Sequence, residues 1–98
     1  MKQGEIWGIN LSPTVGAEIK KKRSAVIIND DAIGILPLKV IVPITEWKVR
    51  FNGAMWMVRI KPDSENNLAK PSAIDTFQIR SVSTRRFLKK TGSVSTEV

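Results

Sequence analysis

The chain has 98 residues, of which 16 are Lys or Arg and 9 are Asp or Glu, so its formal net charge is +7. This length supports one domain with a single modest core, and the positive charge favours nucleic acid, an acidic protein or an anionic membrane surface as a partner. Because the sequence contains neither Cys nor His, disulfides, thiolate zinc sites, cysteine nucleophiles and histidine bases are all excluded.

Six stretches have the period-two alternation or the short apolar run that is typical of β-strands. In chain order they are residues 3–11, 25–28, 36–45, 54–61, 72–80 and 93–97. The third is the clearest, because every second residue from Leu36 to Ile44 is apolar, which predicts one core-facing side. Its two prolines limit backbone donation and indicate an edge or a bulged partner. We assign three aromatic residues to the core: Trp7, Trp56 and Phe87.

The connections between these stretches are polar. A cationic loop ends at Arg23, where the second strand begins, and residues 62–67 predict a mobile, turn-rich loop. One short helix is predicted near residues 83–91, with Ser83 as its N-cap. Without a repeat or a βαβ rhythm, the pattern predicts a mainly β protein, either a small antiparallel barrel or a curled sheet.

No stretch is long and apolar enough to span a membrane, and the first residues lack the apolar core of a signal peptide. We therefore expect a soluble, cytoplasmic protein. The common catalytic motifs with a Gly-rich phosphate loop, a GxSxG elbow or an HExxH pair are also absent.

The remaining polar residues suit one metal-free reaction, the cleavage of RNA by its own 2'-hydroxyl. That reaction needs a group that takes the hydroxyl proton, cations that stabilise the crowded phosphate and a donor for the leaving oxygen. Arg23 suits the phosphate, because its guanidinium offers a rigid fork of donors and stays charged.

Three segments follow one another along the chain: GEIWGINLSPTVGAEIKKKRSAVIIND at 4–30, VIVPIT at 40–45 and SAIDTFQIRSVSTRRFLKKTGSVS at 72–95. Together they resemble the MazF/PemK (Kid) family of toxin-antitoxin endoribonucleases. The resemblance implies the SH3-like barrel of the MazF/Kid/CcdB-type plasmid maintenance toxins. It also implies a homodimer with single-stranded RNA along its interface, sequence-specific cleavage without metal or cofactor that inhibits growth, and a cognate antitoxin with an acidic, disordered segment.

The resemblance carries over to particular residues. It places the family's catalytic arginine on Arg23 and its threonine on Thr45, and it matches Glu18 in the first loop and the Gln-x-Arg pair at Gln78 and Arg80. By chemistry, we expect Arg23 to stabilise the scissile phosphate and to donate to the leaving oxygen, while Thr45 donates to a phosphate oxygen. Glu18 either orients Arg23 or acts as the base.

A larger set is predicted to contact RNA: Lys20, Lys21, Lys22, Trp47, Lys48, Arg50, Asp75, Gln78 and Arg80. Lysines alone would be typical of a solvated loop, and the adjoining Arg23 and the net charge favour phosphate. Trp47 and Phe51 alternate with cations and suit the stacking of unpaired bases. Packing against the core or a dimer interface is an equal alternative for both rings.

The sequence departs from the family at several places: Ser24 replaces a proline after the arginine, and Ile19, Lys20 and Lys21 replace a Gln-Gly-Gly stretch of the first loop. Relatives carry an acidic residue where this chain has Phe77, and Asp75 on the same strand face is the candidate substitute. Relatives also continue into a C-terminal helix, so we treat residues 1–98 as a single toxin domain apparently without that helix.

Two other functions fit the same residues. One is a non-catalytic toxin of this fold that acts on a protein target such as gyrase. The other is a basic SH3-like module that binds RNA without cutting it, in which no single arginine would be decisive.

Overall fold

The computed structural model describes residues 1–10, 22–29 and 37–95, and its elements are seven strands and three single 3-10 turns. The strands are β1 Glu5–Asn10, β2 Lys22–Ile27, β3 Leu38–Glu46, β4 Met57–Ile60, β5 Ser72–Asp75, β6 Arg80–Ser83 and β7 Phe87–Ser93. The turns are η2 Val49–Phe51, η3 Thr76–Gln78 and η4 Thr84–Arg86. No helix among the described residues is long and apolar enough to cross a membrane.

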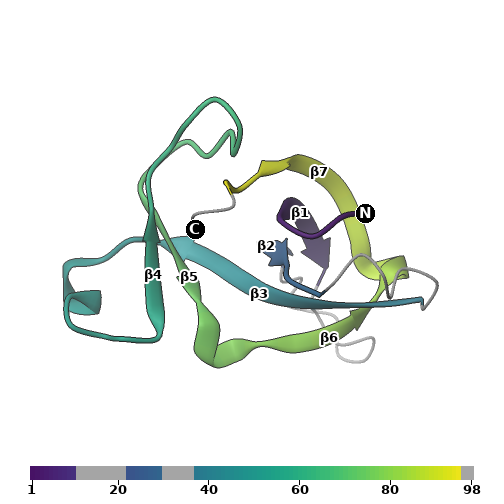
Figure 1. The fold of residues 1–98 in the computed structure, drawn as a ribbon, viewed down its shortest axis with the longest axis horizontal. Helices are drawn as coiled ribbons and strands as arrows, with labels where there is room; N and C mark the ends of the chain where they lie inside the picture. Colours follow the sequence, from purple (N-terminus) through teal and green to yellow (C-terminus); the bar gives the residue numbers. More distant parts are fainter. Residues whose placement is uncertain (11–21, 30–36, 96–98) are drawn as a thin grey trace.

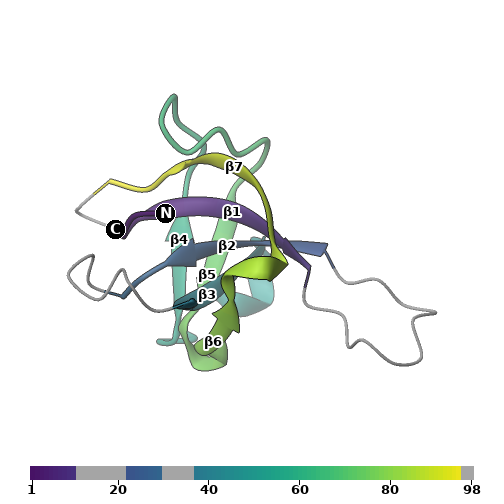
Figure 2. The same cartoon turned by 90° about the vertical axis from the view of Figure 1, so that its right-hand side faces the viewer.

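All strand pairs are antiparallel and form one curled sheet in the order β4-β5-β3-β2-β1-β7 (Figure 1). The long strand β3 is its centre, because β2 pairs with one edge while β5 and β6 pair in succession with the other. Figure 2 shows β7, β1, β2 and β3 as neighbouring, curved strands of this sheet. Among the described residues no pairing joins β4 to β7, so the barrel is not closed.

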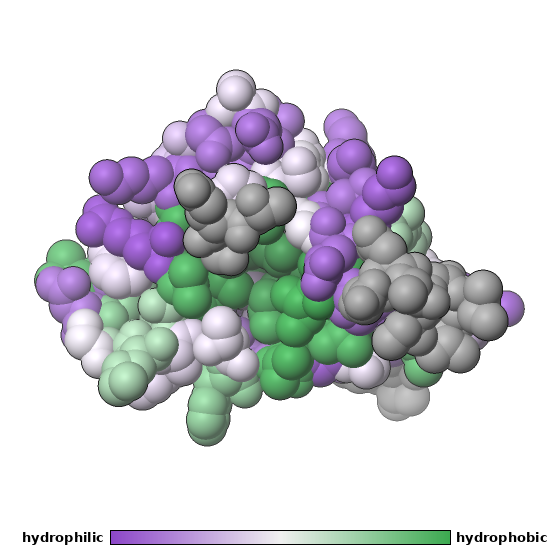
Figure 3. Space-filling view, in the orientation of Figure 1, coloured by the Kyte–Doolittle hydropathy of each residue, from purple (hydrophilic) through white to green (hydrophobic). Residues whose placement is uncertain are grey.

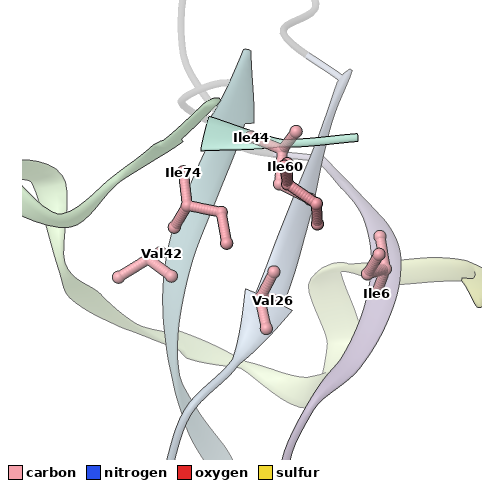
Figure 4. Close-up of a cluster of buried hydrophobic side chains, with 6 residues drawn as sticks. All are labelled: Ile6, Val26, Val42, Ile44, Ile60 and Ile74. Carbon is pink, nitrogen blue, oxygen red and sulfur yellow. The ribbon is translucent and has the colours of Figure 1, made fainter. Parts of the chain in front are cut away.

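Two apolar clusters lie on the two faces of the sheet. The first contains Ile6, Val26, Val42, Ile44, Ile60 and Ile74, which converge from five strands (Figure 4). The second contains Ile9, Ala25, Ile27, Ile41 and Val82, with Trp7 and Phe87 packed against it. Strands β2 and β3 therefore contribute to both clusters, which explains why their sequences are nearly continuous apolar runs.

The prediction of one core-facing side for β3 is therefore wrong. Leu38 lies on the predicted core side but is 48% exposed, whereas Ile41 on the other side is fully buried. The curl of the sheet covers both faces of the middle of β3 and leaves its first residue at the margin. The alternation of residues along β3 does not show which faces are covered, because the neighbouring strands provide that cover.

The helix predicted near residues 83–91 is also wrong. Ser83 does act as a cap, since its hydroxyl accepts a hydrogen bond from the Arg85 amide at 3.2 Å, but only the single turn η4 follows. The chain then enters β7, which pairs with β1, and Phe87 meets the Trp7 ring edge-on at a centroid distance of 5.7 Å. The long-range pairing and this aromatic contact outweigh the local cap, and two arginines in a first helical turn would be unfavourable.

The loop between β4 and β5 is anchored by a buried asparagine, although the sequence predicts a mobile loop. Asn66 is 1% exposed, its Oδ1 accepts from the amides of Asp63 and Leu68, both at 3.0 Å, and its Nδ2 donates to the Lys61 carbonyl at 2.8 Å. The loop lies against β7 (Figure 1), where the Ser93 amide donates to the Glu65 carbonyl at 2.9 Å. All these loop polar groups therefore have protein partners.

Candidate functional site

The register between β2 and β3 brings Arg23 and Thr45 to corresponding positions. The ladder pairs Ala25 with Pro43. Arg23 lies two residues before Ala25 and Thr45 two residues after Pro43, which in an antiparallel pair is towards the same end. Because side chains two positions apart share a face, Arg23 and Thr45 extend from the same side of the sheet. Thr45 also pairs with Ala73 of β5, which holds the other edge of β3 in place.

A hollow of about 780 Å³ opens on this side of the sheet. Six of the predicted site residues line it: Arg23, Thr45, Arg50, Asp75, Gln78 and Arg80. They come from β2, β3, η2, the end of β5, η3 and the start of β6. Segments that are distant in sequence therefore supply one surface.

Positive charge dominates this hollow. Its lining includes three exposed arginines, Arg23, Arg50 and Arg80, and one carboxylate, Asp75. Within the part of the chain that the structure describes, none of the three guanidinium groups forms an ion pair. Arg50 contacts the Phe51 ring, with its guanidinium carbon 5.6 Å from the ring centroid. Uncompensated guanidinium groups that face one hollow favour a phosphate ligand, which accepts their hydrogen bonds in pairs.

The Asp75 side chain caps the turn η3 at the edge of the hollow. One carboxylate oxygen, Oδ1, accepts from the Phe77 amide at 3.1 Å, and the other, Oδ2, accepts from Gln78 Nε2 at 2.7 Å. These bonds start the turn η3 and interrupt the single strand predicted over residues 72–80. Phe77 is 81% exposed as a result, and the Gln78 side chain is fixed at the rim of the hollow.

The other predicted site residues either fall outside the described residues or do not line the hollow. Glu18, Lys20 and Lys21 fall outside the described residues. Lys22 is exposed on β2 opposite Asn10 and does not line the hollow.

The Trp47 and Lys48 side chains have partners on the protein surface beside the hollow. Trp47 is half-buried, meets the Phe51 ring edge-on at 5.7 Å, and has the Arg59 guanidinium carbon 4.9 Å from its centroid. Lys48 Nζ lies 4.0 Å from a Glu46 carboxylate oxygen, and Lys70 Nζ lies 2.9 Å from the other oxygen of that carboxylate.

Trp56 also lines the hollow, which the sequence did not predict. It was assigned to the core because it alternates with Val58 and Ile60, but β4 begins only at Met57, and Trp56 is 51% exposed in the hollow. Its carbonyl accepts from both the amide and the hydroxyl of Thr76, at 2.9 and 2.6 Å, which places its ring 6.1 Å from that of Phe77. The only signal in the sequence is an aromatic residue that follows a Gly-containing turn.

The opposite face of the sheet has a different character. A groove of about 490 Å³ is lined there by Val42, Val58 and Ile74, which alternate along their strands with residues that line the hollow. Figure 3 shows apolar residues gathered in the middle of one face, with polar residues above them. The arginines are therefore concentrated on the side of the hollow, and none that the structure describes lines the groove. Among the described residues, no group of three or more His, Asp or Glu side chains is arranged to hold a metal ion.

A model of the family described as the PemK-like, MazF-like toxins of type II toxin-antitoxin systems matches residues 2–98. The chain belongs to this family. The sequence is also similar to "Endoribonuclease MazF9" of Mycobacterium tuberculosis (strain ATCC 25618 / H37Rv), with 27% identity over 101 residues. That alignment covers 97% of this chain and 83% of the relative. The family resemblance drawn from the three segments is confirmed.

Solved structures from Deinococcus radiodurans share the fold. MazF (Form-I) has a TM-score of 0.74 at 20% identity, with 99% of this chain and 84% of that chain covered. A MazE-MazF structure (Form-II) gives a TM-score of 0.69 at 16% identity and coverages of 96% and 81%. Another (Form-III) gives 0.70 at 17% identity and coverages of 98% and 81%. The predicted mainly β, MazF-type fold is confirmed.

Proposed function

We propose that this chain is the toxin of a type II toxin-antitoxin system and that it is a metal-independent endoribonuclease, which cleaves single-stranded RNA and so inhibits translation and growth. The observation that carries the proposal is the common hollow of Arg23 and Thr45, with two further arginines and no ion pair to any of the three among the described residues. Family membership and the endoribonuclease named in the Mycobacterium relative support it.

The reaction is an in-line transfer within the RNA. The 2'-hydroxyl oxygen attacks the adjacent phosphorus, the bond from phosphorus to the 5'-oxygen breaks, and the products are a 2',3'-cyclic phosphate and a 5'-hydroxyl. Negative charge grows on the phosphoryl oxygens in the transition state, so donors fixed around them lower the barrier. Arg23 supplies two such donors, and the Thr45 hydroxyl supplies one to the same phosphate.

The proton transfers require two further roles. We assign the base that removes the 2'-hydroxyl proton to Glu18, because both oxygens of Asp75 are committed to hydrogen bonds within η3. Arg23 donates towards the leaving 5'-oxygen. Arg50 and Arg80 neutralise the flanking phosphates and contribute mainly to RNA affinity, which should fall with salt concentration.

The assembly follows the family. The protein is proposed to act as a cytoplasmic homodimer whose RNA lies along the interface. Its cognate antitoxin is proposed to place an acidic, disordered segment in the arginine-lined hollow, because carboxylates satisfy the same guanidinium forks as phosphates do. The MazE-MazF structures with the same fold support a toxin-antitoxin pair of this kind.

The chemistry of the products tests this proposal. The purified protein is incubated with a long, unstructured RNA in excess EDTA, and the ends of the fragments are analysed. Discrete cuts with cyclic-phosphate and 5'-hydroxyl ends are expected. Intact RNA, or cuts that need a divalent cation, would contradict the proposal and favour a protein target or simple RNA binding.

A further inference from the structure

The hydrogen bond between Asp75 and Gln78 fixes which end of the Gln78 amide faces the hollow. A side-chain amide has a donor end and an acceptor end of nearly equal size, and either can point outwards when nothing constrains it. An ionised carboxylate only accepts hydrogen bonds. The 2.7 Å contact with Asp75 Oδ2 therefore requires the NH₂ group of Gln78 to face Asp75.

Asp75 cannot turn to relieve this constraint. Its other oxygen, Oδ1, accepts from the Phe77 amide at 3.1 Å, and its backbone pairs with Met57 in the ladder between β4 and β5. Both ends of the Asp75 carboxylate are thus assigned to one donor each. The Gln78 carbonyl oxygen, Oε1, is left as the acceptor that the exposed side chain presents at the hollow.

The surroundings of Gln78 suit a nucleobase. Trp56 lines the same hollow, is half exposed, and leans against the exposed Phe77 ring. A base stacked on an aromatic ring presents its edge to the side chains around that ring. Arg23 and Thr45 line the hollow as well, so such a base belongs to a nucleotide close to the scissile phosphate.

We propose that Gln78, oriented by Asp75, is a specificity-determining residue that accepts a hydrogen bond from the 6-amino group of adenine or the 4-amino group of cytosine in one RNA base. Adenine and cytosine carry an amino group at the position where guanine and uracil carry a carbonyl oxygen. One position beside the cut is therefore selective for adenine or cytosine. This inference rests on the proposed function, since it names the bases that the same site reads.

The substitution Asp75→Asn reverses the orientation of Gln78. The new amide must keep its carbonyl oxygen on the Phe77 amide, because that amide is a donor. Its NH₂ group then occupies the place of Oδ2 and donates to Gln78, whose amide turns over and presents Nε2 to the hollow. The variant should therefore favour guanine or uracil at the position where the native protein favours adenine or cytosine.

The experiment compares the native protein, Asp75→Asn and Gln78→Ala on a single-stranded RNA pool of random sequence, with the cut sites mapped from their 5'-hydroxyl ends. About a tenfold preference for amino bases is expected at one position for the native protein, as one matched hydrogen bond provides. Asp75→Asn should show the reverse preference, and Gln78→Ala none. Thermal melts establish that all three proteins are folded.

A second measurement, of RNA affinity, tests the inference for a variant that binds RNA but does not cleave it. The preferred oligonucleotide is made with 2'-deoxyribose at the scissile nucleotide, in amino-base and keto-base versions, and affinities are measured by fluorescence anisotropy. The same reversal is expected in binding. An unchanged preference in Asp75→Asn, or an amino preference that survives in Gln78→Ala, would overturn the inference. Native protein that cuts RNA with no preference for amino bases, or with a preference for keto bases, overturns the inference alone, whereas native protein that cuts no RNA overturns the proposed function too.

Discussion

Arg23 of β2 and Thr45 of β3 stand two residues beyond the paired Ala25 and Pro43, on the same face of the sheet and in the same hollow. Neither position depends on a loop, since both are held by strands with buried residues on both sides of the sheet. Backbone positions fixed by strands in this way suit catalysis, because they limit how far the two donor side chains must move to reach a bound phosphate.

Replacing Thr45 by valine removes the hydroxyl and keeps the shape of the side chain. Single-turnover cleavage should slow by about 10- to 100-fold, as expected when one hydrogen bond to a charged phosphate is lost. Thermal stability should not change, because Thr45 makes no side-chain hydrogen bond to the described residues. Thr45→Ser, which restores a hydroxyl, serves as the control and should recover most of the rate. Equal rates for Thr45→Val and native protein would remove Thr45 from the mechanism.

Trp56 is expected to act in RNA binding and not in folding. Trp56→Ala should weaken the affinity for single-stranded RNA by about 5- to 100-fold, the range for one lost stacking partner, and should leave the melting temperature nearly unchanged because the ring is half exposed. Trp56→Phe, which keeps a stacking surface, should retain most of the affinity. A large loss of stability in Trp56→Ala with unchanged RNA affinity would instead support the core assignment made from the sequence.

Glu5 links the stability of the fold to pH. Its carboxylate accepts from Trp7 Nε1 at 2.9 Å and from the Lys2 amide at 3.0 Å, and Lys90 Nζ lies 3.1 Å from its second oxygen. Desolvation by itself would raise the pKa of Glu5, but the hydrogen bonds from Trp7, Lys2 and Lys90, with the charge of Lys90, lower this pKa from 4.5 to about 2.

A lowered pKa means that the folded state prefers the ionised carboxylate. The stabilisation is therefore fully present above pH 4.5 and is lost as the pH falls towards 2. Urea unfolding at a series of pH values should show the free energy of unfolding decreasing over this interval, and Glu5→Gln should decrease less. If the two proteins lose stability in parallel, the Glu5 contacts do not produce the effect.

Gly92 is required where β7 meets the loop that connects β4 to β5. A Cβ atom at this position would clash with the Glu65 carbonyl oxygen and would lie 2.7 Å from the Asn66 carbonyl oxygen, both of which are backbone atoms. Gly92→Ala should therefore destabilise the protein by about 1 to 3 kcal/mol, as other overpacked sites do.

Gly8 is the matched control, because its Cβ would meet only the Lys89 carbonyl oxygen, at an ordinary 3.7 Å. Gly8→Ala should change the free energy of unfolding much less than Gly92→Ala in the same urea titration. Similar values for the two variants would show that the loop moves aside freely.

The sequence predicts the centre of this fold better than its margins. The apolar runs of β2 and β3 define buried strands without reference to their neighbours, so the positions of Arg23 and Thr45 could be anticipated once the family segments were matched. Residues 83–91 carry local signals for a helix, above all the Ser83 cap, although the two arginines after it oppose one. Their pairing with β1, which lies about 80 residues away in the chain, determines the structure instead.

The site is less predictable than the strands, because turns form its rim. The carboxylate of Asp75 ends β5 and creates η3, and alternation through residues 72–80 conceals that break. Trp56 lies one residue before β4, where the alternation no longer determines the face. A one-residue difference in the start of a strand thus separates a core residue from one that lines the hollow.

The most direct test of the central claim is the single-turnover cleavage of RNA in EDTA by native protein, Arg23→Ala and Arg85→Ala, with RNA affinity measured on the same samples. Arg85 is exposed in η4 and does not line the hollow, so its variant controls for the loss of one positive charge. We predict that Arg23→Ala loses at least about 100-fold in rate while it retains most of its RNA affinity, and that Arg85→Ala cleaves as the native protein does. Cleavage by Arg23→Ala at the native rate, or equal losses in the two variants, would contradict the account.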